Sequence, residues 1–303
     1  MIVSVDNLVH SYGSRAALAG VSFAVGESEI FGLLGPNGGG KSTLFRILST
    51  MMAHTAGRAA IAGFDVVSQS SQVRRHIGVV FQSQSLDKKL TVEENLNSQG
   101  HLYGLSGAVL RERGEDAMKR LGLVDRRRDL VEMLSGGLRR RVEVAKALLH
   151  KPEVLVMDEP STGLDPGARR ELWQYIETLC AERRVTVLLT THILDEADRC
   201  DRLLLLHEGR AVAEGTPAEL KARIGGDVVV LEVADLEGMR AQLAARFVAE
   251  PRIVDGALRV EIANGHRFIT EVVEAFPGAI RSVALHKPTL EDVFLDETGA
   301  HIG

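Results

Sequence analysis

Residues 35–43 read Gly-Pro-Asn-Gly-Gly-Gly-Lys-Ser-Thr, and this segment restricts the possible folds of the chain more than any other. It matches the phosphate-loop pattern G-x-x-x-x-G-K-[ST], in which glycines let consecutive backbone N–H groups close around phosphate oxygens. Such a loop connects a buried strand to a helix whose N-terminus favours an anion, and residues 29–34 and 43–49 have the patterns of that strand and that helix. The segment therefore predicts a site for nucleotide phosphates.

The residues of this loop have expected parts in holding the phosphates. Lys41 supplies a positive charge toward the β- and γ-phosphates, and the hydroxyl of Ser42 is placed to bind Mg²⁺. The residues expected to surround the nucleotide phosphates are Gly35, Pro36, Asn37, Gly38, Gly39, Gly40, Lys41, Ser42 and Thr43.

The composition is that of an ordinary globular protein. With 303 residues the chain has room for about two domains, and its net charge of −5 gives no reason to expect a nucleic-acid partner. The basic runs at 126–128 and 139–141 are interpreted as solvated turn and helix faces. Cys180 and Cys200 have no paired spacing, which indicates reduced core thiols of a cytosolic protein.

No segment of the sequence has the pattern of a signal peptide or a membrane span. The N-terminus lacks a basic flank followed by a long apolar run. No apolar stretch approaches the ~20 residues needed to cross a bilayer. If the protein works at a membrane, we expect another chain to span it.

Strand and helix patterns predict an α/β nucleotide-binding domain at residues 1–224. Residues 1–25 alternate in the manner of an antiparallel sheet. Buried strands that alternate with helices farther along predict a parallel sheet with helices on both faces. Apolar residues recur at helical spacing over 92–122, so we expect a helical subdomain at about 90–150. Gly225-Gly226 is the expected linker.

Residues 226–303 have the pattern of a small α+β accessory domain. Their order of β-α-β-β-α-β is that of the ferredoxin-like arrangement, with a hairpin around Asp255-Gly256, a favoured two-residue turn. A Thr-Leu-Glu-Asp run at 289–292 resembles a capping box that opens a last helix. The expected strands and helices before it are, in chain order, 228–233, 236–247, 252–254, 258–262, 267–276 and 280–286.

Polar residues follow the predicted parallel strands beside the phosphate loop. Asp158 and Glu159 come directly after the apolar strand 154–157, and we expect Asp158 to help hold Mg²⁺ and Glu159 to polarise an attacking water. Gln82 follows another strand, where its amide could touch both Mg²⁺ and the water. His192 ends a third strand, where it could reach the γ-phosphate. A lone Gln or His at a strand end is usually structural, so the prediction depends on their position.

Leu134-Ser135-Gly136-Gly137-Leu138 is a second place where glycines and a hydroxyl meet a predicted helix start. It is in effect a second anion site, and it lies too far along the chain to belong automatically to the first. Two phosphate-binding elements in one subunit are explained if each completes the other subunit's site in a head-to-tail, two-fold dimer. We therefore expect a second copy of the chain as a partner.

Together these motifs resemble those of the ATPase subunit of an ABC transporter. The motifs occur in the order of that family, and the match covers residues 2–220. They are the phosphate loop, the Gln82 loop, Leu-Ser-Gly-Gly, Val-Leu-Val-Met-Asp-Glu, Ser-Thr-Gly-Leu-Asp at 161–165 and Thr191-His192. The resemblance implies that the chain binds Mg²⁺ and ATP, hydrolyses ATP, and drives a separate transmembrane permease. It also implies a place on the inner face of the cell membrane.

The resemblance further implies parts for single residues. Tyr12 would stack on adenine, while Ser135 and Gly137, with Gly136 between them, would bind the γ-phosphate of the nucleotide held by the facing subunit. Asp165 would link the two sites across the dimer. Glu159 would be the general base, and His192 would hold base and phosphate together.

Two residues depart from the family pattern. Gly39 replaces the alanine or serine more usual in the loop and adds flexibility that must be frozen on binding. Leu138 replaces the more familiar glutamine, so position 138 is given no direct role.

The C-terminal part narrows the resemblance to drug-resistance and polysaccharide-type exporters, which carry a small domain of this size. The runs Ala-Glu-Gly-Thr-Pro at 213–217 and Pro-Thr-Leu-Glu-Asp-Val-Phe at 288–294 support this, and imply export. A soluble ABC ATPase for cofactor assembly, or for another task without transport, stays open as an alternative. A GTPase or small-molecule kinase is rejected, because no guanine-reading Asn/Thr-Lys-x-Asp motif is present.

Overall fold

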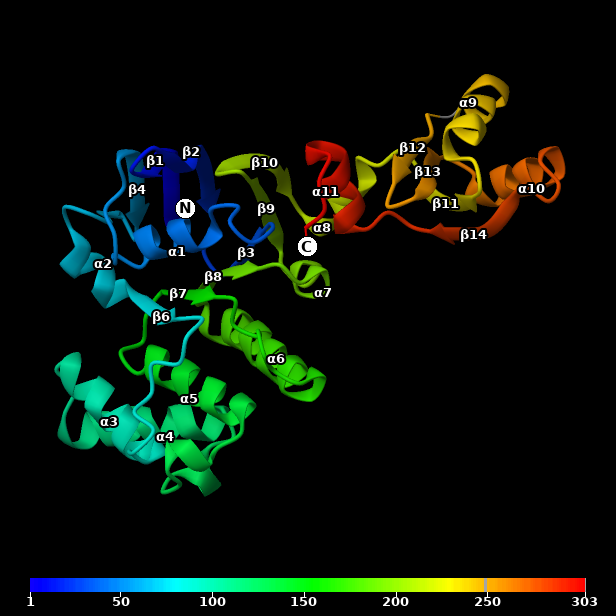
Figure 1. Cartoon of the computed structure of the whole chain (residues 1–303). Coiled ribbons are helices and arrows are strands. Elements are labelled where there is room, and N and C mark those ends of the chain that lie inside the picture. The colour runs from blue at the N-terminus through cyan, green and yellow to red at the C-terminus, as the bar shows by residue number, and fades with distance from the viewer. Residues whose placement is uncertain (248–249, 303) are drawn as a thin grey trace. The chain divides into compact units, whose positions relative to one another are not determined.

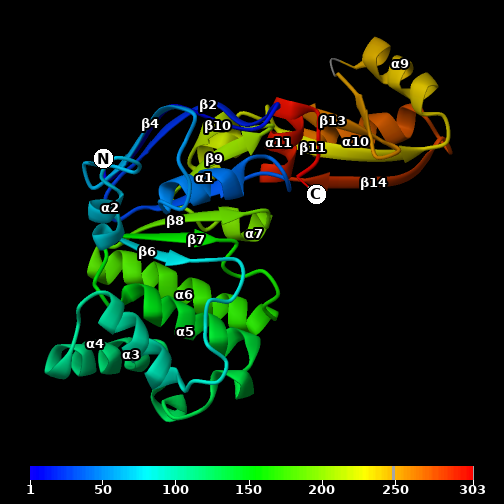
Figure 2. The same cartoon turned by 60° about the vertical axis from the view of Figure 1, so that its left-hand side comes forward.

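The computed structural model describes residues 1–247 and 250–302 (Figure 1, Figure 2). They form two units, of which the first comprises Met1–Glu214 with Ile302 and the second Gly215–His301. Within these described residues, no helix combines the length and the apolar character needed to cross a bilayer.

The second unit begins before the Gly225-Gly226 pair that the sequence suggests as a linker. Helix α8 (Pro217–Ala222) lies between the two positions and packs against helix α11 (Leu290–Thr298). The hydroxyl of Thr216 opens α8 by accepting a hydrogen bond from the backbone N–H of Glu219. The turn into the second unit is therefore a capped helix start.

A four-stranded antiparallel sheet opens the first unit, in the order β2-β1-β4-β5. As predicted, the first two strands pair in an antiparallel manner, and the chain turns between them at Gly13, where φ is +60°. The second pair was not predicted, because the first three residues of β4 are exposed and break the apolar pattern. The strands are β1 (Val3–Tyr12), β2 (Arg15–Val25), β4 (Ala56–Ile61) and β5 (Phe64–Asp65).

A six-stranded sheet in the order β10-β9-β3-β8-β7-β6 carries the site. The predicted parallel pairing is confirmed from β9 through β3, β8 and β7 to β6. Every residue of the central strands β3, β7 and β8 is buried, which explains their unbroken apolar runs. The strands are β3 (Ile30–Leu34), β6 (Ile77–Val80), β7 (Val154–Asp158), β8 (Thr186–Thr191), β9 (Arg202–His207) and β10 (Arg210–Gly215).

Helices cover both faces of this sheet, as the sequence predicts. In Figures 1 and 2, α1 lies on one face and α5 and α6 lie on the other, with α3 and α4 beyond α5. Apolar side chains of α1 share one core with β1, β2, β3 and β7. The helices are α1 (Lys41–Leu48), α2 (Ser70–His76), α3 (Val92–Leu102), α4 (Gly107–Arg120), α5 (Gly136–Leu148), α6 (Pro166–Arg183) and α7 (Leu194–Ala197), with short 3₁₀ turns at Val124–Arg126 and Val131–Met133.

The two cysteines are free and buried in this unit. Burial raises the pKa of both the Cys180 and the Cys200 thiol, which keeps them in the unreactive protonated form. Their expected character as reduced core thiols agrees with these surroundings.

The second unit has the predicted ferredoxin-like arrangement. Its sheet is antiparallel throughout, in the order β12-β13-β11-β14. Apolar side chains of the sheet, such as Val229 and Leu231, share a core with Leu243 of α9 and Phe268 of α10. The elements are β11 (Asp227–Val233), α9 (Leu236–Arg246), β12 (Arg252–Val254), β13 (Ala257–Ile262), α10 (Gly265–Ala275) and β14 (Ile280–His286), followed by α11.

Candidate nucleotide site

The phosphate loop links β3 to α1 and is closed by two glycines. A Cβ at Gly35 would lie 2.1 Å from the carbonyl oxygen of Leu206, and one at Gly40 would lie 2.7 Å from that of Ala17. Gly40 also has a φ of +108°, which side chains rarely allow. Only glycine fits either position, and the loop backbone can therefore pack tightly against the ends of the neighbouring strands.

A cavity of about 350 Å³ lies over this loop. It contains the cations Arg15, Lys41 and Arg46 and the carboxylate Glu159, so positive charge dominates, as a polyphosphate requires. Tyr12 lies at its edge with 46% of its surface exposed, which leaves ring area free for stacking. The predicted residues that line the cavity are Tyr12, Asn37, Gly38, Gly40, Lys41, Ser42, Thr43 and Glu159.

The other predicted loop residues form the floor under Lys41. The Lys41 ammonium donates to the carbonyl oxygens of Gly35, at 2.6 Å, and Pro36, at 3.0 Å. The N–H of Gly39 also donates to Pro36, at 3.1 Å. Burial lowers the pKa of Lys41, while the carboxylates of Glu159 and Asp158 oppose this shift. A poorly solvated ammonium gains from a nearby anion, which suits it to phosphate.

Glu159 is the point at which the remaining predicted residues converge. Its Oε2 accepts from Gln82 Nε2 at 3.0 Å and from Thr162 Oγ1 at 3.2 Å. Its Oε1 lies 3.2 Å from His192 Nδ1 and 3.9 Å from the Lys41 ammonium. Glu159 is 7% exposed, so these four side chains surround its carboxylate with little solvent around it.

Thr190 ties Asp158 and Glu159 together from the neighbouring strand. Its hydroxyl accepts from the backbone N–H of Glu159 at 2.9 Å and donates to Asp158 Oδ1 at 2.6 Å. Glu159 has a φ of +43°, a strained conformation that persists only where the surroundings enforce it. Burial raises the pKa of Asp158, against the effect of the Thr190 hydrogen bond.

The predicted second anion element lies apart from this cavity within the subunit. Ser135 caps α5 and accepts from the N–H of Leu138 at 3.3 Å, and Asp165 caps α6. Neither these residues nor Gly136 and Gly137 line the cavity. Figures 1 and 2 place α5 on the opposite face of the sheet from α1. Within one subunit, the Ser135-Gly136-Gly137 element and the cavity over the phosphate loop are therefore separate.

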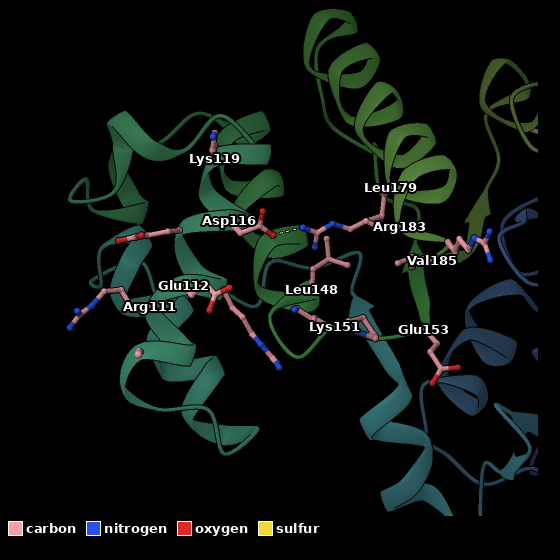
Figure 3. A pocket seen from close by; sticks show the side chains of 15 residues that line it. Arg111, Glu112, Asp116, Lys119, Leu148, Lys151, Glu153, Leu179, Arg183 and Val185 are labelled. Atoms are coloured by element: carbon pink, nitrogen blue, oxygen red, sulfur yellow. Dashed lines mark hydrogen bonds and ion pairs between the residues drawn. The ribbon is translucent and has the colours of Figure 1, made fainter.

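A larger cavity of about 1050 Å³ lies between α4 and the turns that lead into β7 and β8 (Figure 3). Charged side chains line it, and the ion pair of Asp116 and Arg183 joins α4 to the end of α6 there. This cavity adjoins the amino ends of the strands, whereas Asp158 and Glu159 stand at the carboxyl ends. Open α/β sheets bind ligands at the carboxyl ends, so the smaller cavity is the candidate site.

Sequence reasoning missed several residues of the site. Arg15 and Arg46 line the cavity, and Thr162 and Thr190 hold the two carboxylates. A signal existed for Arg46, because it lies on the helix that leaves the phosphate loop. Thr162 lies only three residues after Glu159, within the run at 161–165. Thr190 gave no signal, since its contact depends on how β7 and β8 pair.

Comparison with known proteins identifies the family. A family model for "ABC transporter" matches residues 18–162, and one for "ATP-binding protein DrrA1-3-like, C-terminal domain" matches 215–298. The daunorubicin resistance ATP-binding protein DrrA3 of Streptomyces coeruleorubidus is 40% identical, over 98% of this chain and 96% of that protein. The chain belongs to the ABC transporter family of ATP-binding proteins.

Two further comparisons agree with this membership. The Nod factor export ATP-binding protein I of Ralstonia nicotianae is 40% identical over 98% of this chain and 94% of its own. A solved ATP-binding cassette dimer in a post-hydrolysis state, bound to ADP and Pi, superposes with a TM-score of 0.64 and 28% identity, covering 71% of this chain and 98% of that one. This ABC protein accordingly binds ATP with Mg²⁺ and hydrolyses ATP.

Proposed function

We propose that this ABC ATPase works as a head-to-tail dimer of two copies that drives a separate membrane permease, for export. The observation that carries the proposal is the split site. Lys41, Gln82 and His192 gather around Glu159 at one cavity, while Ser135 caps a helix on the other face of the sheet. Each half-site needs a partner that a second copy can supply.

The proposed parts of the site residues follow from their contacts. Lys41 exchanges its bonds to loop carbonyls for the phosphates, and Tyr12 stacks on adenine. Glu159 accepts a proton from the attacking water, and His192 holds the base toward the γ-phosphate. Ser135, Gly136 and Gly137 of the facing copy enclose the γ-phosphate, and Asp165 joins the two sites.

Oxygen donors suited to Mg²⁺ stand beside the cavity. The hydroxyl of Ser42, the amide oxygen of Gln82 and the carboxylate of Asp158 are hard ligands of the kind that Mg²⁺ takes. A bound Mg²⁺ would neutralise phosphate charge. Thr190, through its hydrogen bond to Oδ1, orients the Asp158 carboxylate for this part.

Export and a permease partner are supported by the named relatives, which serve daunorubicin resistance and Nod factor export. A place at the inner face of the cell membrane follows, because ATP is a cytoplasmic substrate. The two domains at residues 1–224 and 226–303 would then divide the work. The first carries hydrolysis, and the second is an accessory module of the exporter ATPases.

The proposal is tested by capture from native membranes. Tagged Glu159→Gln protein should bind ATP but hydrolyse it at least about a hundredfold more slowly, which traps the closed dimer. With Mg·ATP it should then recover a polytopic membrane protein, identified by mass spectrometry. Lys41→Ala is the matched control, because it retains the fold but loses productive ATP binding.

The outcomes separate the proposal from its alternative. Capture of a membrane protein by Glu159→Gln, but not by Lys41→Ala, supports a transporter subunit. Recovery of soluble partners alone would favour an ABC ATPase for cofactor assembly or another task. Unchanged turnover of Glu159→Gln would remove this residue as the base.

A further inference from the structure

Arg140 is buried in α5 although it lies in a run of three arginines. The interpretation of residues 139–141 as a solvated helix face is wrong for this position, since Arg140 is 6% exposed. Its guanidinium donates to the carbonyl oxygens of Phe81, at 2.5 Å, and Pro160, at 2.6 Å. Longer bonds reach those of Asp158, at 3.3 Å, and Glu159, at 3.4 Å.

Glu143, one turn farther along α5, completes this contact. Its Oε2 lies 2.9 Å from Arg140 Nη1, and its Oε1 accepts from the backbone N–H of Ser85 at 2.7 Å. Lys146, a further turn along, donates to the carbonyl oxygen of Ser85 at 2.7 Å. Side chains on one face of α5 thus form hydrogen bonds to both ends of the segment 81–85.

The segments that Arg140 contacts carry the two side chains that meet at the site. Gln82 follows Phe81 directly, and its amide donates to Glu159 at 3.0 Å. Arg140 bonds to the backbone on both sides of this contact, including the carbonyl of Glu159 itself. It also helps to enforce the strained φ of +43° at Glu159, together with Thr190.

Stability alone does not account for such a pair. A buried arginine–glutamate pair ordinarily contributes little, because the cost of removing both charges from water offsets their attraction. A planar guanidinium that reaches four carbonyls on two loops instead fixes geometry. Since Ser135 is the N-cap of α5, a movement of that end of the helix also displaces Arg140 and Glu143.

We propose that Arg140 and Glu143 are positioning residues, which hold the Gln82–Glu159 contact and transmit movement of the Ser135 end of α5 to it. The inference rests on the proposed role of Glu159 as base. The inference adds a mechanical link to that role. A nucleotide held by the facing copy would contact Ser135, and the resulting movement of α5 would change the position of Glu159. A permease that displaces the Gln82 loop would act on the same contact.

Arg140→Gln tests the link by steady-state kinetics. It should lower kcat by about ten- to a hundredfold and change KM for ATP by less than about twofold, since the base is displaced while the nucleotide cavity is intact. Arg140→Lys should not restore kcat, because one ammonium cannot span both loops. Arg120→Gln removes an exposed ion pair to Asp116 on α4 and should leave both constants unchanged.

A second variant separates positioning from folding. Arg140→Met with Glu143→Leu removes both buried charges and fills the same space. It should lower the melting temperature only moderately, so that the protein is folded at the assay temperature, yet keep the low kcat. Full kcat in this double variant would overturn the inference. The inference would also be overturned if the reductions in kcat caused by Arg140→Gln and Glu159→Gln multiplied in the variant that carries both changes. Residues that act through the same base should not have independent effects.

The failures of the two proposals are distinguishable. If Glu159→Gln alone leaves turnover unchanged, the base is lost and the inference with it. If Glu159→Gln is inactive but Arg140→Gln turns over normally, only the link through α5 is refuted.

Discussion

Asp158 is a carboxylate that the folded chain holds where charge is disfavoured. Burial raises its pKa, so the ionised form needed at neutral pH destabilises the protein without nucleotide. We predict that Asp158→Asn raises the melting temperature of the nucleotide-free protein. The same change should lower Mg²⁺-dependent ATP hydrolysis by about ten- to a hundredfold, because the proposed carboxylate ligand of Mg²⁺ is lost.

The pH dependence of this stability gain checks its cause. A raised carboxyl pKa costs stability above that pKa and costs nothing well below the usual value of 3.8, where the group is neutral in both states. The gain from Asp158→Asn should therefore be full at neutral pH and disappear as the pH falls through the raised pKa. Calorimetry across pH measures this gain in melting temperature, with Asp125→Asn at an exposed position as the control. A gain that became larger toward acid pH would contradict the prediction.

At the residue scale, the sequence predicts the side chains that the structure brings together around Glu159, and it misses residues that hold the two carboxylates. Lys41, Gln82, Glu159 and His192 were found because each follows a recognisable strand or lies in a recognisable loop. Thr190 was not, because its part depends on the parallel register that sets it opposite Asp158. Arg140 was misread, since buried and solvated arginines look alike until the loops they face are placed.

At the scale of elements, the last helix of the second unit offers a graded test. Thr289 and Asp292 form a capping box at α11, as the sequence predicts. Asp292 also pairs with buried Arg259, at 2.5 Å. Thr289→Ala should cost about 1 kcal/mol, the usual value for a helix cap. Asp292→Ala should cost about 3 kcal/mol, because it leaves buried Arg259 with only its longer contact to Glu261, at 3.4 Å.

Hydrogen exchange of the full chain measures these costs locally. Amides of α11 should exchange faster in Thr289→Ala and much faster in Asp292→Ala, while amides of β3 and β7 keep their protection. Equal effects of the two variants would show that the Arg259 pair adds nothing to the cap.

The elements themselves were predictable where the hydrophobic pattern was regular. The ferredoxin-like order was predicted because turn residues bound each strand, as Asp255-Gly256 does between β12 and β13. Strand β4 was missed because its exposed start at residues 56–58 carries no apolar alternation. It pairs with β1 through backbone bonds that local side chains do not reveal.

At the scale of the whole molecule, the proposed shared site depends on two elements that lie apart within one subunit. Lys41 opens α1 and Ser135 caps α5, and these two helices cover opposite faces of one sheet (Figure 1, Figure 2). Lys41 lines the nucleotide cavity and Ser135 does not, so under the proposal a second copy brings Ser135 to the phosphates. In a two-fold dimer, one interface would form two such composite sites. Activity should then depend on which defects meet in one composite site.

Mixing two inactive variants tests this directly. Lys41→Ala should not bind ATP productively, and Ser135→Arg should block closure by its bulk and charge. A mixed dimer still has one intact site, made of Lys41 from one copy and Ser135 from the other. About half of randomly paired dimers are mixed and each has one good site of two, so the mixture should recover up to about a quarter of native ATPase activity.

Mixing Lys41→Ala with Glu159→Gln should recover none, because both defects lie in the same half-site. Recovery in that control, or none with Ser135→Arg, would contradict the head-to-tail arrangement.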